Sequence, residues 1–239
     1  MCGRYVEPAK APLEVFWKIA RREWDSPRQR FNVAPTTSVP IVLRAEDGAY
    51  ELRGARWGLI PHWWRDAKPP TISFNARSEE AAVKPTWRDS YHHSRCLMLA
   101  QGWYAWSENE PAREGAPKGR GATGQPYYMH CEADPVIAIA GLLAYWRSPA
   151  GDAIVSCALL SRDAAPSLVR IHHRMPAILP AESFESWLTH ETDEAEVARM
   201  VAGARSDFVG RPVSIRVNNT RNDSPDLIED ISREWPAAG

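Results

Sequence analysis

The sequence has no run of about eighteen apolar residues, and its first ten residues, MCGRYVEPAK, have no apolar core of the kind found in a signal peptide. Membrane spanning and secretion are therefore disfavoured, and we expect a cytoplasmic protein. The chain also has no excess of charge of one sign, since 29 basic residues face 30 acidic ones and the net charge is -1. Any surface that binds nucleic acid must therefore be local, because no global positive field exists.

Cysteine is scarce and widely spaced. The chain has four cysteines, Cys2, Cys96, Cys131 and Cys157, with no CxxC pair and no histidine at zinc-ligand spacing. Disulfides, a structural metal and a cofactor are therefore not expected. This cysteine usage also favours a reducing compartment.

Tryptophan and proline, by contrast, are abundant, with 11 and 20 residues. Aromatic residues cluster beside turn residues at 61–64 and 102–106. Such residues can stack on nucleic-acid bases when they lie on loops beside a groove. The alternative is that most tryptophans pack in the core, because large aromatics are highly buried on average.

Apolar runs bounded by Gly, Pro or charged turns predict a series of β-strands. They cover residues 39–43, 95–100, 127–131, 136–143, 153–160 and 213–217. Apolar residues three and four positions apart predict two short helices, over 180–188 and 194–201. A further amphipathic helix is expected where four residues share one face before a basic turn over 18–22: Leu13, Phe16, Trp17 and Ala20.

The organisation expected for the whole chain is a single α+β domain over residues 1–239, with a mainly antiparallel sheet flanked by short helices. With 44% hydrophobic residues, 239 residues can bury a substantial core. The stretch 108–125 is rich in Gly, Pro and charge, which predicts a mobile excursion between strands. No internal repeat or long linker divides the chain, and we expect a monomer.

The chemistry available at the amino terminus depends on Cys2. A small second residue permits removal of Met1, which would leave a free α-amine beside a thiol, with ordinary pKa values of about 8 and 8.5. The amine can form a Schiff base with an aldehyde, and the thiol can then add to close a five-membered thiazolidine. On position alone, the sequence favours an ordinary residue after the start codon.

Two polar stretches offer partners for Cys2. In residues 171–176, His172 can move protons near neutral pH and Arg174 can hold a phosphate; a solvated histidine pair at a strand end is the alternative. In residues 74–79, the amide of Asn75 can donate and accept hydrogen bonds and Arg77 can hold a phosphate; a capped helix start is the alternative.

Seven short stretches, taken in order, resemble the SRAP family, the SOS response-associated peptidases known as abasic-site DNA-protein crosslinkers. They span almost the whole chain: residues 1–5, 30–35, 57–61, 75–79, 95–97 with 102–104, 171–176 and 217–219. The resemblance implies an α+β fold with a barrel-like, mainly antiparallel sheet core. It also implies that the partner is single-stranded DNA carrying abasic sites, whose covalent capture shields the lesion in the DNA damage response.

The resemblance also implies roles for individual residues. Cys2 would be the crosslinking nucleophile, Asn75 would help to hold its amine and the opened sugar, and His172 would manage protons. The residues implied or offered for contacts with phosphate, sugar or bases are Arg77, Arg174, Arg4, Trp63, Trp64 and Trp106.

One position departs from the family pattern. The family carries a glutamate between the residues equivalent to Tyr104 and Trp106, where this chain has Ala105. That carboxylate is the expected general acid and base, a role worth roughly 100-fold to 10,000-fold in rate. Three explanations are open: an engineered substitution, a substitute carboxylate such as Glu79 or Glu108, or a member that binds DNA without efficient chemistry.

Two other functions remain open on this evidence. Cys2, His172 and Asn75 would supply the Cys-His-Asn set of a cysteine peptidase, including one limited to removing its own amino terminus. The absence of a carboxylate at Ala105 would also suit a noncatalytic sensor that binds single-stranded DNA reversibly. Covalent capture of abasic sites is the main prediction, at a rate lowered by Ala105.

Overall fold

The computed structural model describes residues 3–10, 19–70, 73–112, 124–189 and 191–232, and the structural statements below refer to these residues. The strands are β1 (Tyr5–Val6), β2 (Ile19–Arg22), β3 (Ser38–Arg44), β4 (Tyr50–Trp57), β5 (Asn75–Arg77), β6 (Arg95–Ala100), β7 (Gly102–Pro111), β8 (Gly124–His130), β9 (Ile137–Arg147), β10 (Ala153–Asp163), β11 (Arg174–Pro176), β12 (Ile178–Leu179) and β13 (Val209–Pro212). The α-helices are α2 (Ser78–Ala81), α3 (Arg88–His93), α4 (Phe184–Leu188) and α5 (Glu194–Ala202), and short 3-10 helices are η1 (Ala181–Ser183), η2 (Ile215–Asn218) and η3 (Pro225–Ile228).

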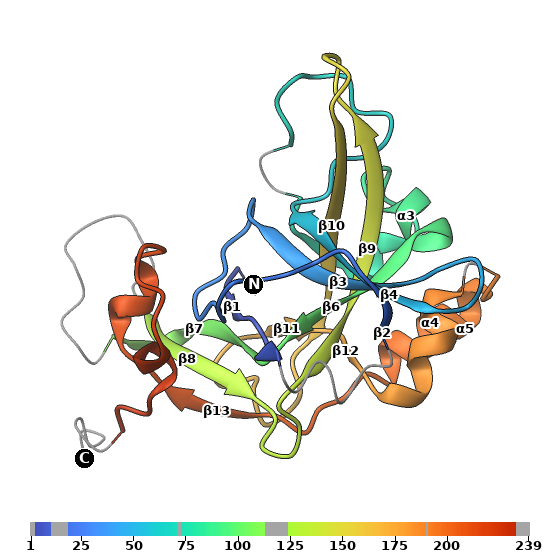
Figure 1. Ribbon diagram of the computed structural model, residues 1–239. Coiled ribbons are helices and arrows are strands. Elements are labelled where there is room, and N and C mark those ends of the chain that lie inside the picture. The colour runs from blue at the N-terminus through green and yellow to red at the C-terminus, as the bar shows by residue number, and fades with distance from the viewer. Residues whose placement is uncertain (1–2, 11–18, 71–72, 113–123, 190, 233–239) are drawn as a thin grey trace.

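The larger sheet closes on itself (Figure 1). Its strands pair in the order β10-β4-β3-β6-β9, and β9 pairs back with β10, so that they form a ring. Within the ring only β4 and β10 run parallel, and the other pairs are antiparallel. The predicted α+β fold with a mainly antiparallel sheet is confirmed, and its sheet core is ring-like.

The apolar runs of the ring strands are explained by burial on both faces of the sheet. Ile41 and Met98 are paired across β3 and β6 and belong to one hydrophobic cluster, whereas their neighbours Val42 and Leu97 belong to a second cluster. The second cluster includes Trp187 of α4 and residues of α5, so these helices cover that face. Successive side chains in a strand point to opposite faces, and a strand buried on both sides therefore reads as continuously apolar.

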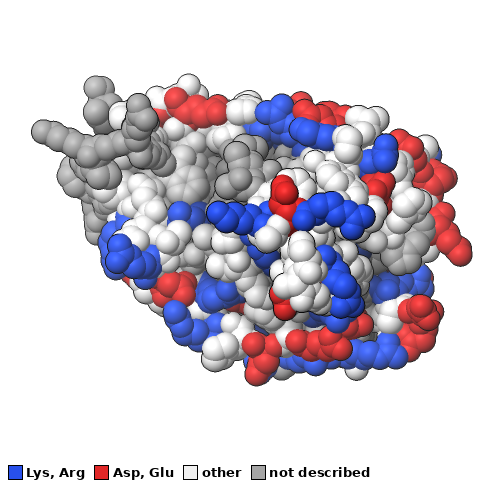
Figure 2. All heavy atoms as spheres, turned by 90° about the horizontal axis from the view of Figure 1, so that it is seen from above, with Lys and Arg blue, Asp and Glu red and all other residues white. Residues whose placement is uncertain are grey.

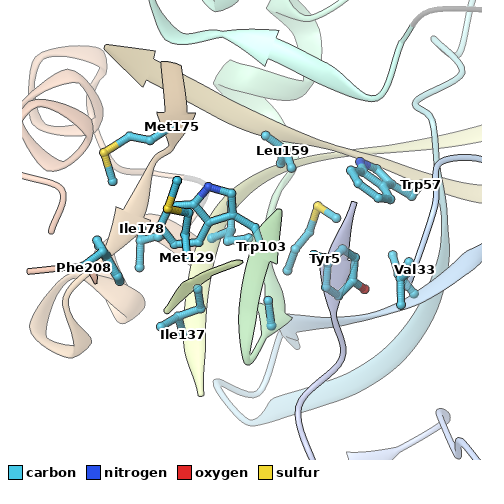
Figure 3. Close-up of a cluster of buried hydrophobic side chains, with 14 of the residues drawn as sticks. Tyr5, Val33, Trp57, Trp103, Met129, Ile137, Leu159, Met175, Ile178 and Phe208 are labelled. Atoms are coloured by element: carbon cyan, nitrogen blue, oxygen red, sulfur yellow. The ribbon is translucent and has the colours of Figure 1, made fainter. Parts of the chain in front are cut away.

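A smaller sheet, in the order β1-β7-β8-β13, packs against the ring through the first cluster. Figure 3 shows this cluster: Trp103 and Met129 come from the smaller sheet, and Leu159 comes from the larger one. Trp103 meets Phe208 edge-on, with ring centroids 5.1 Å apart. Tyr5 lies at the other side of the cluster, 5.4 Å from the ring of Trp57.

The opposite face of the smaller sheet is covered by the last described segment of the chain. Asn32 is buried and holds this segment, because its Nδ2 donates to the carbonyls of Val217, Asn219 and Asn222 at 2.9–3.1 Å. Its Oδ1 accepts a hydrogen bond from Arg4 at 2.9 Å. The stretches 30–35 and 217–219 thus have a structural function, which is to join the beginning and the end of the fold.

Several sequence predictions are confirmed. The six residues of β6 coincide with the predicted range, and β3, β8, β9 and β10 contain most or all of their predicted ranges. The two predicted helices correspond to η1 with α4 and to α5. Cys96, Cys131 and Cys157 are buried free thiols.

Other predictions need correction. Residues 213–217 do not form a strand, because β13 ends at Pro212 and Ile215–Asn218 forms η2. Residues 19–22 of the expected basic turn form β2, parallel to β4; Leu13, Phe16 and Trp17 lie outside the described residues. The expected excursion over 108–125 is shorter, because β7 extends to Pro111 and β8 begins at Gly124; residues 113–123 lie outside the description.

The aromatic stretch 102–106, which the sequence places beside turn residues, lies within β7. Trp103 and Tyr104 are almost fully buried, so the alternative of core packing holds for this stretch. Helices in the described part of the chain are too short or too polar to cross a membrane.

Candidate functional site

The residue that follows Cys2 has a defined place in the fold. Strand β1 pairs with β7 through Tyr5 and Trp103, and the carbonyl of Arg4 accepts the N–H of Tyr104 at 3.0 Å. A Cβ placed on Gly3 would lie 3.9 Å from the ring of Phe74. Cys2 itself lies outside the described residues, but its peptide-bonded neighbour lies beside the residue that precedes Asn75.

Asn75 is positioned by β5, which runs parallel to β10 with Asn75 opposite Leu159. The carbonyl of Phe74 accepts hydrogen bonds from Trp57 Nε1 at 2.9 Å and from the Leu159 N–H at 3.1 Å. Asn75 is half-buried. The predicted alternative of a helix cap is wrong for this residue, because α2 begins at Ser78 with Arg77 at the cap position and no side-chain cap.

His172 is held as a neutral imidazole. The backbone N–H of Arg174 donates to its Nδ1 at 2.9 Å, so the ring proton resides on Nε2. Its side chain is only 11% exposed, and burial lowers its pKa to about 4, although the negative charge of Glu108 opposes this shift. His172 is therefore uncharged at pH 7 and unlike the solvated histidine of the alternative prediction.

A carboxylate faces this imidazole. Glu108 Oε1 lies 3.6 Å from His172 Nε2. The two oxygens of Glu108 also accept from Nδ1 of His173, at 2.8 and 3.0 Å, and the two imidazole rings stack with centroids 4.6 Å apart. The hydrogen bond from His173 lowers the pKa of Glu108, which is thus ionised at pH 7.

The same three side chains offer one possible metal ligand each, within 4.8 Å of one another. The tautomer of His172 opposes this use. A metal-binding imidazole donates from its second nitrogen, whereas Nδ1 of His172 accepts a hydrogen bond and leaves the proton on Nε2, the atom that faces Glu108. The donor set is therefore suited to proton exchange rather than to metal binding.

The arginines predicted to bind phosphates differ in how far their guanidinium groups are exposed and already engaged. Arg174 is buried and contacts the carboxylates of Glu79 and Asp163 and the carbonyl of Ser161. Arg4 is half-buried and donates to backbone carbonyls of residues 217 and 218. Arg77 is exposed, with Glu80 at 3.8 Å. Phosphate binding by these residues stays a prediction, and Arg77 is the one with a solvent-facing guanidinium.

The predicted tryptophans also differ in their exposure to solvent and in their contacts. Trp63 is 39% exposed and its ring lies 6.1 Å from that of Trp64. The carbonyl of Trp64 accepts a hydrogen bond from the buried Trp146 at 2.8 Å, which fixes this surface loop to β9. Trp106 is half-buried, donates to Asn218 Oδ1 at 2.7 Å and packs on the opposite face of β7 from Ala105.

Charge on the molecular surface is mixed. On the face seen in Figure 2, basic and acidic side chains of the described residues are interspersed. This distribution agrees with the net charge of -1. It fits a DNA contact made by a few local groups rather than by a broad positive surface.

Ala105 is 4% exposed and lies in the first hydrophobic cluster, opposite Tyr127 of β8. No carboxylate therefore projects from this position, but Glu108 lies three residues further along β7. Sequence reasoning named Glu108 as a possible substitute and missed His173 as its partner. The adjacency of His172 and His173 was the signal available in the sequence, because Glu108 lies 65 residues away from His173.

Comparison with known proteins agrees with this architecture. Residues 1–220 match the family described as "SOS response associated peptidase (SRAP)". "Abasic site processing protein YedK" of Escherichia coli (strain K12) is 30% identical over 241 residues, covering 97% of this chain and 100% of the relative. "Abasic site processing protein YoqW" of Bacillus subtilis (strain 168) is 30% identical over 202 residues, covering 83% and 85%.

Solved structures show the same fold. A phage-related protein from Bordetella bronchiseptica aligns with a TM-score of 0.65 at 29% identity, covering 89% of this chain and 94% of the other. A protein from Bacteroides thetaiotaomicron aligns with a TM-score of 0.75, covering 95% and 98%. The second is 20% identical and supports the fold alone.

Proposed function

The chain belongs to the SRAP family, and on this premise we propose that it processes abasic sites in DNA by capturing them covalently, in single strands, through Cys2. The observation that carries the proposal is the position of Gly3 against Phe74. Phe74 directly precedes Asn75 at the start of β5, so Gly3, the peptide-bonded neighbour of Cys2, lies beside the strand that bears Asn75. Relatives named for abasic-site processing supply the substrate class.

The chemistry follows from an aldehyde and a free amino-terminal cysteine. The ring-opened deoxyribose of an abasic site exposes an aldehyde, and the neutral α-amine of Cys2 adds to its carbon. Loss of water gives the imine, and the thiol then adds across the C=N bond to close the thiazolidine. One water molecule leaves, and no oxidant or reductant is needed. Met1 must be removed first, because an amide nitrogen cannot form the imine.

Asn75 and His172 are assigned supporting roles. The amide of Asn75 both donates and accepts, which suits it to hold the amine and a sugar hydroxyl. His172 is neutral at pH 7, because burial lowers its pKa to about 4, and it enters the reaction as a hydrogen-bond donor through Nε2. Trp63 is exposed on its loop, which supports its assignment to stack on an unpaired base.

The test uses processed protein and a single-stranded oligonucleotide with one abasic site. We expect an adduct that survives denaturing electrophoresis, and none with an intact oligonucleotide or one whose abasic aldehyde has been reduced to an alcohol. Salt-sensitive binding that does not depend on the aldehyde, with no adduct, would instead identify a noncatalytic single-strand binder. Cleavage of peptides by protein with an acetylated amino terminus would support a peptidase.

The reaction also has a predicted pH dependence. The α-amine, with a pKa of about 8, attacks only after losing its proton, so the crosslinking rate should rise about tenfold per pH unit and level off near pH 8. His172 adds no inflection between pH 5 and 7, because its pKa is lowered to about 4. Rates measured from pH 5 to 9 check this. An inflection near pH 6.5 that is lost in His172→Gln would show that His172 titrates normally.

A further inference from the structure

We propose that Glu108 supplies the carboxylate that works with His172 in this chain, and that His173 connects this pair to solvent. The inference rests on the proposed function and deepens it, because it names the residues that exchange protons during capture. Glu108 exchanges the protons, and His172, whose Nε2–H faces this carboxylate, is the positioning residue. The carboxylate of Glu108 would take the place of the carboxylate that is absent at Ala105.

The position of Glu108 results from an irregularity in β7. The register with β8 is regular from Gly102, opposite His130, to Trp106, opposite Pro126, and the next pairing joins Pro111 to Gly124. Between these two pairings, β7 moves on by five residues, from 106 to 111, whereas β8 moves by only two, from 126 to 124. Extra residues of this kind form a bulge, which bends a strand and redirects its side chains.

The regular alternation of β7 extends only to Trp106, so it does not fix the side on which Glu108 projects. Trp103 and Ala105 belong to the first hydrophobic cluster, whereas Tyr104 and Trp106 pack on the opposite face. Continued alternation would place Glu108 on the side of Trp106, away from the first cluster. The observed side chain instead reaches His172 and His173.

Local hydrogen bonds hold the bulge in place. Ser107 Oγ accepts the N–H groups of Asn109 at 3.2 Å and Glu110 at 3.0 Å. The N–H of Glu108 donates to the carbonyl of Ile171 at 3.2 Å. The last bond ties the bulge to the residue immediately before His172, so the carboxylate and the imidazole are positioned by the same contact.

Neighbouring carboxylates are engaged elsewhere. Glu79, the other substitute considered from the sequence, forms an ion pair with the buried Arg174, and this hydrogen bonding lowers its pKa. Glu110, in the same bulge, accepts a hydrogen bond from the hydroxyl of Tyr127 at 2.6 Å. The geometry therefore selects Glu108 rather than Glu79.

The proton transfers balance within this set. When the amine attacks the aldehyde, the carboxylate of Glu108 accepts the proton that the nitrogen releases, while the Nε2–H of His172 faces this carboxylate and holds it in place. The carboxylic acid of Glu108 then donates this proton to the hydroxyl of the carbinolamine. The C–O bond breaks as the nitrogen lone pair forms the C=N bond, and water leaves. His173 is 57% exposed and can exchange protons between Glu108 and solvent.

The test compares Glu108→Gln with the matched control Glu110→Gln in single-turnover crosslinking to abasic single-stranded DNA. We expect the rate to fall roughly 100-fold in Glu108→Gln and to stay within about twofold in Glu110→Gln. A second measurement separates chemistry from structure: formate is added to Glu108→Ala, since the exposed site admits a small carboxylate. Formate should restore about tenfold in rate, whereas chloride at equal ionic strength should not.

The outcomes distinguish the two proposals. If the unaltered chain forms no adduct, the proposed function itself fails. If the unaltered chain crosslinks and Glu108→Gln crosslinks at the same rate, the function stands and the role of Glu108 is overturned. A slow Glu108→Ala that formate does not accelerate also overturns it, because the loss would then be structural.

Discussion

Cys2→Ala is expected to abolish the adduct that survives denaturation. Alanine also permits removal of Met1, so the variant keeps a free α-amine and can still form an imine with the abasic aldehyde. Without the thiol the thiazolidine cannot close, and the imine hydrolyses. Denaturing electrophoresis should show no stable adduct, whereas borohydride, which reduces imines, should trap one.

The matched control for this substitution is Cys131→Ala, which removes a buried thiol within the described part of the chain. It should leave crosslinking unchanged. A stable adduct formed by Cys2→Ala at the unaltered rate would contradict the assignment of Cys2 as the residue that captures the aldehyde.

The second large effect is expected for a substitution of Arg95, which should lower the stability of the fold. Its guanidinium is buried and donates to four backbone carbonyls, those of Tyr91 and His92 at the end of α3 and of Trp187 and Thr189 at the end of α4. Helix carboxyl ends carry partial negative charge, which the guanidinium balances. Arg95 therefore fastens two helices to the ring.

Arg95→Met should lower the free energy of unfolding by about 3 to 5 kcal/mol, because it leaves these carbonyls buried without their donor. Denaturant unfolding measures this change. Arg88→Met, in which the lost arginine is exposed on α3 beside Asp89, should cost less than about 1 kcal/mol. Equal effects of the two substitutions would show that the buried contacts of Arg95 contribute little.

Much of the ring could be predicted from the sequence, because strands buried on one or both faces carry strong apolar patterns. Strand β6 is an example, since all of its residues are buried. Strand β4 could not be predicted in this way, because its buried residues Leu52, Ala55 and Trp57 alternate irregularly with charged residues. Its position depends on pairing with β3 and β10, which are distant in the sequence.

The failed strand over 213–217 shows a limit of periodicity. Val213 and Val217 are both buried, and a spacing of four residues fits a helical turn as well as a strand. Ser214 favours the turn, because its side chain accepts the N–H of Arg216 at the start of η2. The carbonyl of Val217 is then bound by Arg4 and Asn32, which lie far away in the chain.

The candidate site was predictable in its members but not in its geometry. Asn75 and His172 were found through motifs, and the structure adds the tautomer and the burial of His172. The orientation of Glu108 depends on a bulge, which strict alternation of residues does not reveal. The ion pairs of Arg174 with Glu79 and Asp163 likewise depend on the tertiary structure and could not be predicted from the sequence.

The central claim is that the α-amine and the thiol of Cys2 together capture an abasic aldehyde, and mass spectrometry of the crosslinked amino-terminal peptide tests it most directly. We expect a peptide that begins at Cys2, carries the sugar remnant with the loss of one water molecule, and resists thiol alkylation. A remnant attached elsewhere, or an adduct peptide that retains Met1 or a freely alkylated Cys2 thiol, would contradict the claim.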